Sequence, residues 1–442
     1  MRPSPRLIRL LLIGCGSALL VSGAHIVQPE LGALLAKAWW LLLAVLLLSA
    51  TLDFITGNNV YGLTGKRTLP GNLALGVEQP IQLQLNNQSD RSLVFVLSDQ
   101  LPIQLRSQKL PLHIQLQPGQ QLETGYLVQP IRRGQAEFGQ LEALVSSPWA
   151  LWQKHVRLGQ TQSVRVYPNF LGISSLQSLS TEQTLRQLGV IQHQRRGEGL
   201  DFRQLREYRR GDSQRQIDWR ASARMQKLIS REYQDERDQE IIFLLDCGRR
   251  MRTHDGDLSH FDHALNAMLL SAYVAIRQGD AVGLQCFAGN QSRLPAVKGE
   301  GAINLLLNHV YDIHSGTAHS DYSAAAEQLL ARQQRRALVI LLTNVRDEDS
   351  ADLSAAVQQL SRHHLVMVAS LRESSLDSLL QKPIANFDDA LMNCAGRDLI
   401  QRRERLLQQL RARNTILADA LPRDMHTSLV ETYWQLKRSG KM

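Results

Sequence analysis

Histidine and aspartate side chains gather in one short segment, between His254 and His263. His260 and His263 are three residues apart, so a helix would place both imidazoles on one face. Imidazole and carboxylate groups together bind zinc or nickel, and the segment therefore offers the hypothesis of a metal-dependent hydrolase. The alternative is a polar loop and helix start, in which the aspartates stabilise the helix dipole and the histidines are solvated. The side chains concerned are His254, Asp255, Asp257, His260 and His263.

A second candidate site is an arginine-rich segment, residues 195–231, which holds eleven basic and five acidic residues. Aromatic residues are interleaved with the arginines, an arrangement that can stack the bases and neutralise the phosphates of a single-stranded nucleic acid. The alternative is that the guanidinium groups pair with neighbouring carboxylates, such as those of Asp212 and Asp218. We favour the pairing because acids recur throughout the segment, and we do not expect nucleic acid to be the partner.

The composition is that of an ordinary globular protein, with 50 Lys and Arg residues, 41 Asp and Glu residues and a net charge of +9. The sequence has no G-x-S-x-G elbow, no phosphate-binding loop and no H-E-x-x-H motif. We therefore expect a non-catalytic protein without a cofactor. The four cysteines are scattered singly, which predicts free thiols in a reducing compartment rather than disulfides or a thiolate zinc site.

Two uncharged apolar runs near the N-terminus, residues 10–27 and 38–52, predict a pair of membrane helices. Arginines precede the first run, whereas the connector holds one acid and no base before Lys37. The positive-inside rule then places the N-terminus in the cytoplasm. A hairpin returns the chain to the same side, so we expect a multi-pass membrane protein with cytoplasmic soluble domains. A cleaved signal peptide is the alternative explanation of the first run.

The rest of the chain divides into a β-rich part and a part in which strands and helices alternate. Period-two apolar patterns in the first part predict a small antiparallel sandwich. In the second part, buried strands alternate with amphipathic helices, which predicts a doubly wound, mostly parallel α/β sheet. We expect four segments: a two-helix anchor (1–57), the sandwich (58–168), a linker with the arginine-rich segment (169–239), and the α/β domain with C-terminal helices (240–442).

The arginine-rich segment also carries a spaced signature, F-x-x-L-R-x-Y-x-x-G-D-x-x-R-x-I-D-W-x-x-S-A-R, which begins at Phe202. This pattern resembles the signature of the bacterial domain-of-unknown-function 58 (DUF58) family, and the similarity of layout extends over nearly the whole chain. It marks the following signature or partner-binding residues: Phe202, Leu205, Arg206, Tyr208, Gly211, Asp212, Arg215, Asp218, Trp219 and Arg224.

The resemblance implies a von Willebrand factor A-like α/β domain in a protein of the bacterial inner membrane. It also implies a partner, a MoxR-type AAA+ ATPase, with which the protein acts in chaperone, assembly or envelope-maintenance work. In von Willebrand A domains, a divalent metal is bound by D-x-S-x-S after the first strand, a hydroxyl from a later loop and a carboxylate after the fourth strand. Such oxygen ligands suit hard divalent cations.

This sequence departs from that metal-site pattern. Asp246 is kept, but Gly248 and Arg250 stand at the serine positions, and Arg250 brings a positive charge into the site. Ser320 can replace the later hydroxyl, while Asn344 offers an amide in place of the distal carboxylate. Because two hydroxyls and one negative charge are lost, we do not expect tight Mg²⁺ binding. The leading hypothesis is therefore a membrane-anchored, non-catalytic scaffold that binds another protein with the same loops and with the arginine-rich segment.

Overall fold

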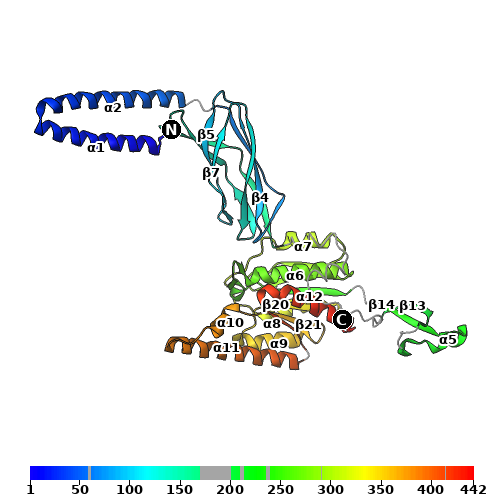
Figure 1. Ribbon diagram of the computed structural model, residues 1–442. Helices are drawn as coiled ribbons and strands as arrows, with labels where there is room; N and C mark the ends of the chain where they lie inside the picture. The colour runs from blue at the N-terminus through cyan, green and yellow to red at the C-terminus, as the bar shows by residue number, and fades with distance from the viewer. Residues whose placement is uncertain (58–60, 170–200, 210–213, 235–238, 290, 414) are drawn as a thin grey trace. The chain divides into compact units, whose positions relative to one another are not determined.

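The chain is a mixed α/β protein that divides into two compact units, Met1–Val166 and Tyr167–Met442 (Figure 1). A computed structural model describes residues 1–57, 61–169, 201–209, 214–234, 239–289, 291–413 and 415–442. The four segments expected from the sequence remain a prediction.

Unit 1 begins with two apolar helices, α1 (Pro5–Val27) and α2 (Pro29–Gly57). Both helices are long and apolar enough to cross a membrane. The α2 helix begins at Pro29 and therefore includes Glu30 and Lys37, which precede the uncharged run and are good helix formers. Gly32 permits the close turn between the helices, since a Cβ there would lie 2.3 Å from the Cα atom of His25.

The remainder of unit 1 consists of antiparallel sheets with the strand orders β1–β11–β10–β5–β7, β2–β4–β8–β6 and β3–β12–β9. Buried and more exposed residues alternate along these strands, as the period-two pattern predicts. The strands are β1 (Arg2–Pro3), β2 (Leu63–Thr68), β3 (Asn72–Ala74), β4 (Gln79–Asn87), β5 (Leu93–Asp99), β6 (Leu105–Ser107), β7 (Leu112–Leu116), β8 (Gln121–Pro130), β9 (Gly134–Phe138), β10 (Leu141–Ser146), β11 (Trp152–Leu158) and β12 (Gln162–Tyr167).

Unit 2 is built on an open sheet with the strand order β19–β18–β15–β20–β21–β22. All neighbouring strands are parallel except the edge strand β19, which pairs antiparallel with β18. The strands are β15 (Glu240–Asp246), β18 (Ala281–Phe287), β19 (Arg293–Val297), β20 (Leu338–Thr343), β21 (Leu365–Leu371) and β22 (Ile416–Ala420). The alternation of strands and helices in the sequence predicts this mostly parallel arrangement.

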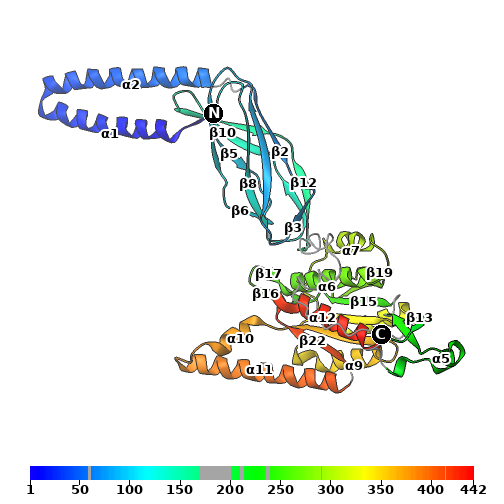
Figure 2. The same cartoon turned by 45° about the vertical axis from the view of Figure 1, so that its right-hand side comes forward.

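Helices cover both faces of this sheet (Figures 1 and 2). One core contains side chains of α6, α7 and α12, and the other contains side chains of α8, α9 and α11. Alternate residues of β15 enter the two cores, so this strand is buried on both faces. The helices are α6 (His260–Arg277), α7 (Ala302–Val310), α8 (Tyr322–Arg332), α9 (Ser350–Leu360), α10 (Ser374–Gln381), α11 (Phe387–Ala412) and α12 (Met425–Arg438).

A buried ion pair fixes the last helix to the sheet. The Nζ atom of Lys437 lies 2.6 Å from Oδ2 of Asp280, directly before β18, and both side chains are almost fully buried. The hydroxyl of Tyr433 donates to the same oxygen at 2.6 Å. The pair therefore joins α12 to the amino-terminal end of β18.

We predict that Lys437→Met destabilises unit 2 by about 3–5 kcal/mol, because the substitution leaves a buried carboxylate without its cation. Thermal unfolding and hydrogen exchange of the α12 peptide in the full chain measure the effect. Lys441→Met is the matched control, because Lys441 is exposed. If the two variants had the same unfolding temperature, the Lys437–Asp280 ion pair would not stabilise unit 2, and the prediction would be contradicted.

Candidate functional site

The candidate site lies where the direction of the chain across the sheet changes. β15 is flanked by β18 on one side and by β20 on the other, and both pairings are parallel. Open α/β sheets bind ligands outside the carboxyl ends of the strands at such a switch point. Asp246 ends β15 and Thr343 ends β20, so the structure brings together two polar side chains from strands far apart in the sequence.

The Asp246 carboxylate is fully buried and is held by three donors of the protein. Its Oδ1 atom accepts hydrogen bonds from the Ser320 hydroxyl at 2.7 Å and from the Gly248 amide at 2.8 Å. Its Oδ2 atom accepts from the Thr343 hydroxyl at 2.7 Å. Burial raises the pKa of Asp246, and these hydrogen bonds oppose that shift. The carboxylate is thus satisfied by its own neighbours.

Gly248 leaves the space that the Ser320 hydroxyl occupies. A Cβ at position 248 would lie 2.3 Å from Ser320 Oγ and 3.0 Å from Asp246 Oδ1. The φ angle of Gly248 is −79°, which any residue adopts. Glycine is therefore required here because a side chain would not fit, and not because of the backbone conformation. The Ser320 hydroxyl occupies the volume that a side chain at position 248 would fill, and from there it donates to Asp246.

Arg250, expected to bring charge to the site, is buried and paired with carboxylates that follow β20. Its guanidinium forms a close bidentate ion pair with Asp349 and a second pair with Glu348, with Nη2 to Oε2 at 2.7 Å. Its positive charge is therefore neutralised next to Asp246. Sequence analysis missed Asp349 and Glu348, although the acidic run after the predicted strand is a visible signal.

Asn344 turns toward the loop after β21 rather than toward Asp246. Its Nδ2 atom donates to Oε1 of Glu373 at 3.1 Å and lies 3.3 Å from Nδ1 of His260. Glu373 also forms a close ion pair with Arg346. Burial lowers the pKa of His260, so the ring favours the neutral form. Of the predicted metal-site positions, Asp246, Gly248 and Ser320 meet, whereas Arg250 and Asn344 are engaged by neighbouring carboxylates.

The structure does not assemble the histidine cluster into a ligand set. His254 and Asp257 are exposed, in or beside the short strands β16 (His254–Asp255) and β17 (Leu258–Ser259). Asp255 accepts a hydrogen bond from Ser374, and Nε2 of His263 is buried without a hydrogen-bond partner. Among the residues that the structure describes, no group of three or more His, Cys, Asp or Glu side chains is arranged to hold a metal.

The signature segment forms a small hairpin with a helix: β13 (Asp201–Glu207), α5 (Trp219–Met225) and β14 (Ile229–Gln234). Asp218 caps α5 by accepting from the Ala221 amide at 3.0 Å, and it pairs with Arg231 at 2.9 Å. These two contacts, the amide first, lower the pKa of Asp218. Asp218 therefore supports the local fold, as the pairing hypothesis expects.

Other signature residues have different environments. Trp219 is 68% exposed, Leu205 and Arg224 are also exposed, and Arg206 donates to the carbonyl of Glu207. The Tyr208 amide donates to Leu228, across the hairpin. Gly211 and Asp212 lie outside the described residues, and only the backbone places Phe202 in β13 and Arg215 in a 3-10 turn.

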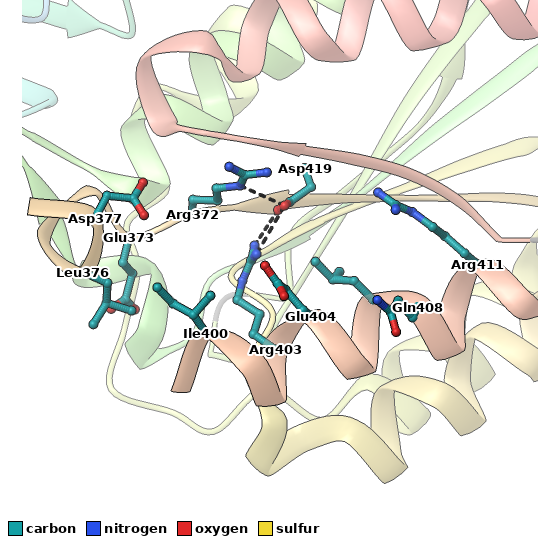
Figure 3. Close-up of a pocket in the computed structure, with 11 residues that line it drawn as sticks. Arg372, Glu373, Leu376, Asp377, Ile400, Arg403, Glu404, Gln408, Arg411 and Asp419 are labelled. Atoms are coloured by element: carbon teal, nitrogen blue, oxygen red, sulfur yellow. Dashed lines mark hydrogen bonds and ion pairs between the residues drawn. The ribbon is translucent and has the colours of Figure 1, made fainter. Parts of the chain in front are cut away.

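A groove of about 430 Å³ lies beyond the carboxyl ends of β21 and β22, along α10 and α11 (Figure 3). Asp419 in this groove accepts from Arg372 at 2.9 Å and forms a bidentate pair with Arg403. A smaller cavity of about 80 Å³ shares Glu373, Leu376 and Arg403 with the groove and reaches Asn344. The candidate site and the groove therefore adjoin.

We predict that Gly248→Ala destabilises unit 2 by about 1–3 kcal/mol, because the new methyl group displaces Ser320 from Asp246. In the Gly248→Ala/Ser320→Ala double variant the loss should be smaller than the sum of the two single losses, since one clash is removed. Gly301→Ala is the control, because nothing lies within 4 Å of a Cβ there. Additive losses in chemical unfolding would contradict this packing.

Residues 204–390 match the family model described as "Protein of unknown function DUF58", whereas the comparison with curated proteins found no match. A crystal structure of an aerotolerance-related membrane protein from Bacteroides fragilis is 18% identical, with 38% of this chain and 99% of that chain covered and a TM-score of 0.23. Salmonella alpha-2-macroglobulin is 20% identical, with 24% of this chain but only 7% of that chain covered and a TM-score of 0.19. The match over residues 204–390 confirms the resemblance that the signature carries and identifies this chain as one with a DUF58 region.

Proposed function

We propose that this chain is a membrane-anchored, non-catalytic scaffold that binds another protein with the carboxyl edge of its α/β sheet. The two apolar helices support the membrane anchor. The arginines before the first apolar run support a location in the bacterial inner membrane, with the β-rich part of unit 1 and the whole of unit 2 facing the cytoplasm. The order of the open sheet and its antiparallel edge strand support a von Willebrand A-like fold.

One observation carries the proposal: the charged groups at the switch point are already paired within the protein. Asp246 has three donors, and Arg250 has two carboxylate partners. A cation would have to displace these contacts before it reached Asp246. The pairing instead holds the strand-end loops, with the exposed Glu348 among them, in one arrangement. A preorganised surface loses less free energy to ordering when it binds a folded partner.

Apolar side chains beside this surface supply the other part of a protein interface. Leu399 on α11 lines the smaller cavity and is 48% exposed. Leu391 and Phe387 lie about two and three turns before Leu399 on α11 and are more exposed still. An apolar patch with a polar rim is the usual composition of a protein-binding site. Following the DUF58 resemblance, we propose a MoxR-type AAA+ ATPase as the partner.

We predict that Leu399→Glu weakens capture of a purified MoxR-type ATPase by the full chain about tenfold, which corresponds to roughly 1.4 kcal/mol. The reason is that a carboxylate would be buried in the apolar part of the interface. Capture is measured on detergent-solubilised chain at equal protein abundance and unchanged thermal stability.

Leu305→Glu is the matched control, because Leu305 is 52% exposed on α7, which packs on the opposite face of the sheet. This variant should capture the ATPase as the wild type does. Equal capture by wild type and Leu399→Glu, or no capture by the wild type, would contradict the proposed docking surface and partner.

A further inference from the structure

A loop of the β-rich part of unit 1, residues 147–151, is tied to the second membrane helix. The buried carboxylate of Asp53, near the end of α2, accepts hydrogen bonds from the Ser147 hydroxyl, from the Trp149 amide at 2.9 Å and from the Leu151 amide at 3.1 Å. Charge-assisted hydrogen bonds of this kind are strong in a buried setting. The loop is therefore held at a fixed level on α2.

The first membrane helix is tied to the same loop. The amide of Ser4, the residue that caps α1, donates to the Leu151 carbonyl at 2.8 Å, and the Ser4 hydroxyl donates to the Ala150 carbonyl at 2.6 Å. The indole of Trp152 donates to the Ala50 carbonyl of α2 at 2.8 Å. Because both helices contact the loop, it cannot move along the membrane normal independently of them.

The helices fix how deep the loop lies. The uncharged run of α1 begins at Leu10, six residues after Ser4, which corresponds to about 9 Å along a helix. The uncharged run of α2 ends at Leu52, next to Asp53. Each headgroup layer of a bilayer is about 5–8 Å thick outside the hydrocarbon core. The α2 helix thus places the loop at the inner boundary of the headgroup layer, and the α1 helix places its contact with the loop at the outer edge of that layer.

Trp149 is the large aromatic side chain that this loop exposes, next to the exposed Pro148. It is 55% exposed, although the carboxylate of Asp53 fixes its backbone. The next residue, Ala150, has a left-handed φ of +57°, a backbone conformation that is unfavourable for residues other than glycine. Phe54 of α2 is also partly exposed and packs edge-to-face against Trp152. Aromatic side chains are enriched at the headgroup level, where indole has both an apolar surface and a polar N–H group.

We propose that the Ser147–Leu151 loop is a lipid-contacting element that places Trp149 in the headgroup layer of the bilayer. The occupant of this surface is the phospholipid interface itself, because the loop is continuous with two membrane helices. The contact adds a third attachment point to the two helices. It therefore fixes the orientation of the β-rich part relative to the membrane plane.

The test uses nitroxide labels on the full chain in phospholipid nanodiscs of phosphatidylcholine and phosphatidylglycerol. The exposed cysteines Cys15 and Cys394 are first replaced by serine, while Cys247 and Cys286 are buried and retained. Labels are attached to the single variants Trp149→Cys, Ile103→Cys and Leu42→Cys. Collision rates with oxygen, which partitions into lipid, and with a water-soluble nickel chelate then report the depth of each label.

Two positions calibrate the depth. Ile103 is 89% exposed and follows β5 in the chain. The last residue of β5, Asp99, pairs with Leu141 at the start of β10, whereas the Ser147–Leu151 loop follows the other end of β10. Leu42 is 67% exposed within the apolar run of α2. We expect the ratio of oxygen to nickel-chelate collisions to be highest at position 42, lowest at position 103 and intermediate at position 149.

A second measurement keeps the native side chain. The fluorescence difference between wild type and Trp149→Phe isolates the Trp149 emission, and lipids brominated near the headgroup should quench it. A label at position 149 as water-accessible as the one at position 103, together with an unquenched difference signal, would overturn the proposal. A water-accessible label at position 42 would also overturn it, because the helices would then not span the bilayer.

Discussion

A buried carboxylate at the end of a parallel strand determines the local structure of the α/β unit. Removing a charge from water costs several kcal/mol unless hydrogen bonds or an opposite charge replace the solvent. Asp246 obtains these bonds from Ser320, Thr343 and the Gly248 amide. The requirement therefore fixes three segments against one another: the loop after β15, the approach to α8 and the end of β20.

The neighbouring charges obey the same constraint. Arg250 is buried and has carboxylate partners in the loop after β20, and Asn344 donates to Glu373 in the loop after β21. Buried ion pairs add little net stability, but removal of one partner is costly. The pairing therefore holds the strand-end loops in one arrangement, and a preorganised surface loses less entropy when it binds a partner. This is the physical link between the closed site and the proposed scaffold role.

The sequence predicts the sheet of unit 2 well, because continuous apolar runs such as residues 338–342 can be buried on both faces only in a covered parallel sheet. The uncharged run does not show where α2 begins, because Glu30 and Lys37 before that run also belong to the helix. The family resemblance, rather than the residues alone, identifies Asp246, Gly248 and Ser320 as positions of one site. The sequence does not show that the Ser320 hydroxyl occupies the space left by Gly248, because that contact joins residues more than seventy positions apart and depends on packing.

Whether the Asp246 site is closed to cations is tested most directly by titrating the full chain with magnesium in a calorimeter and repeating the titration on Asp246→Asn. The closed arrangement predicts the same weak, unsaturable heats for both proteins. Saturable binding of one magnesium ion per chain that disappears in Asp246→Asn would contradict it.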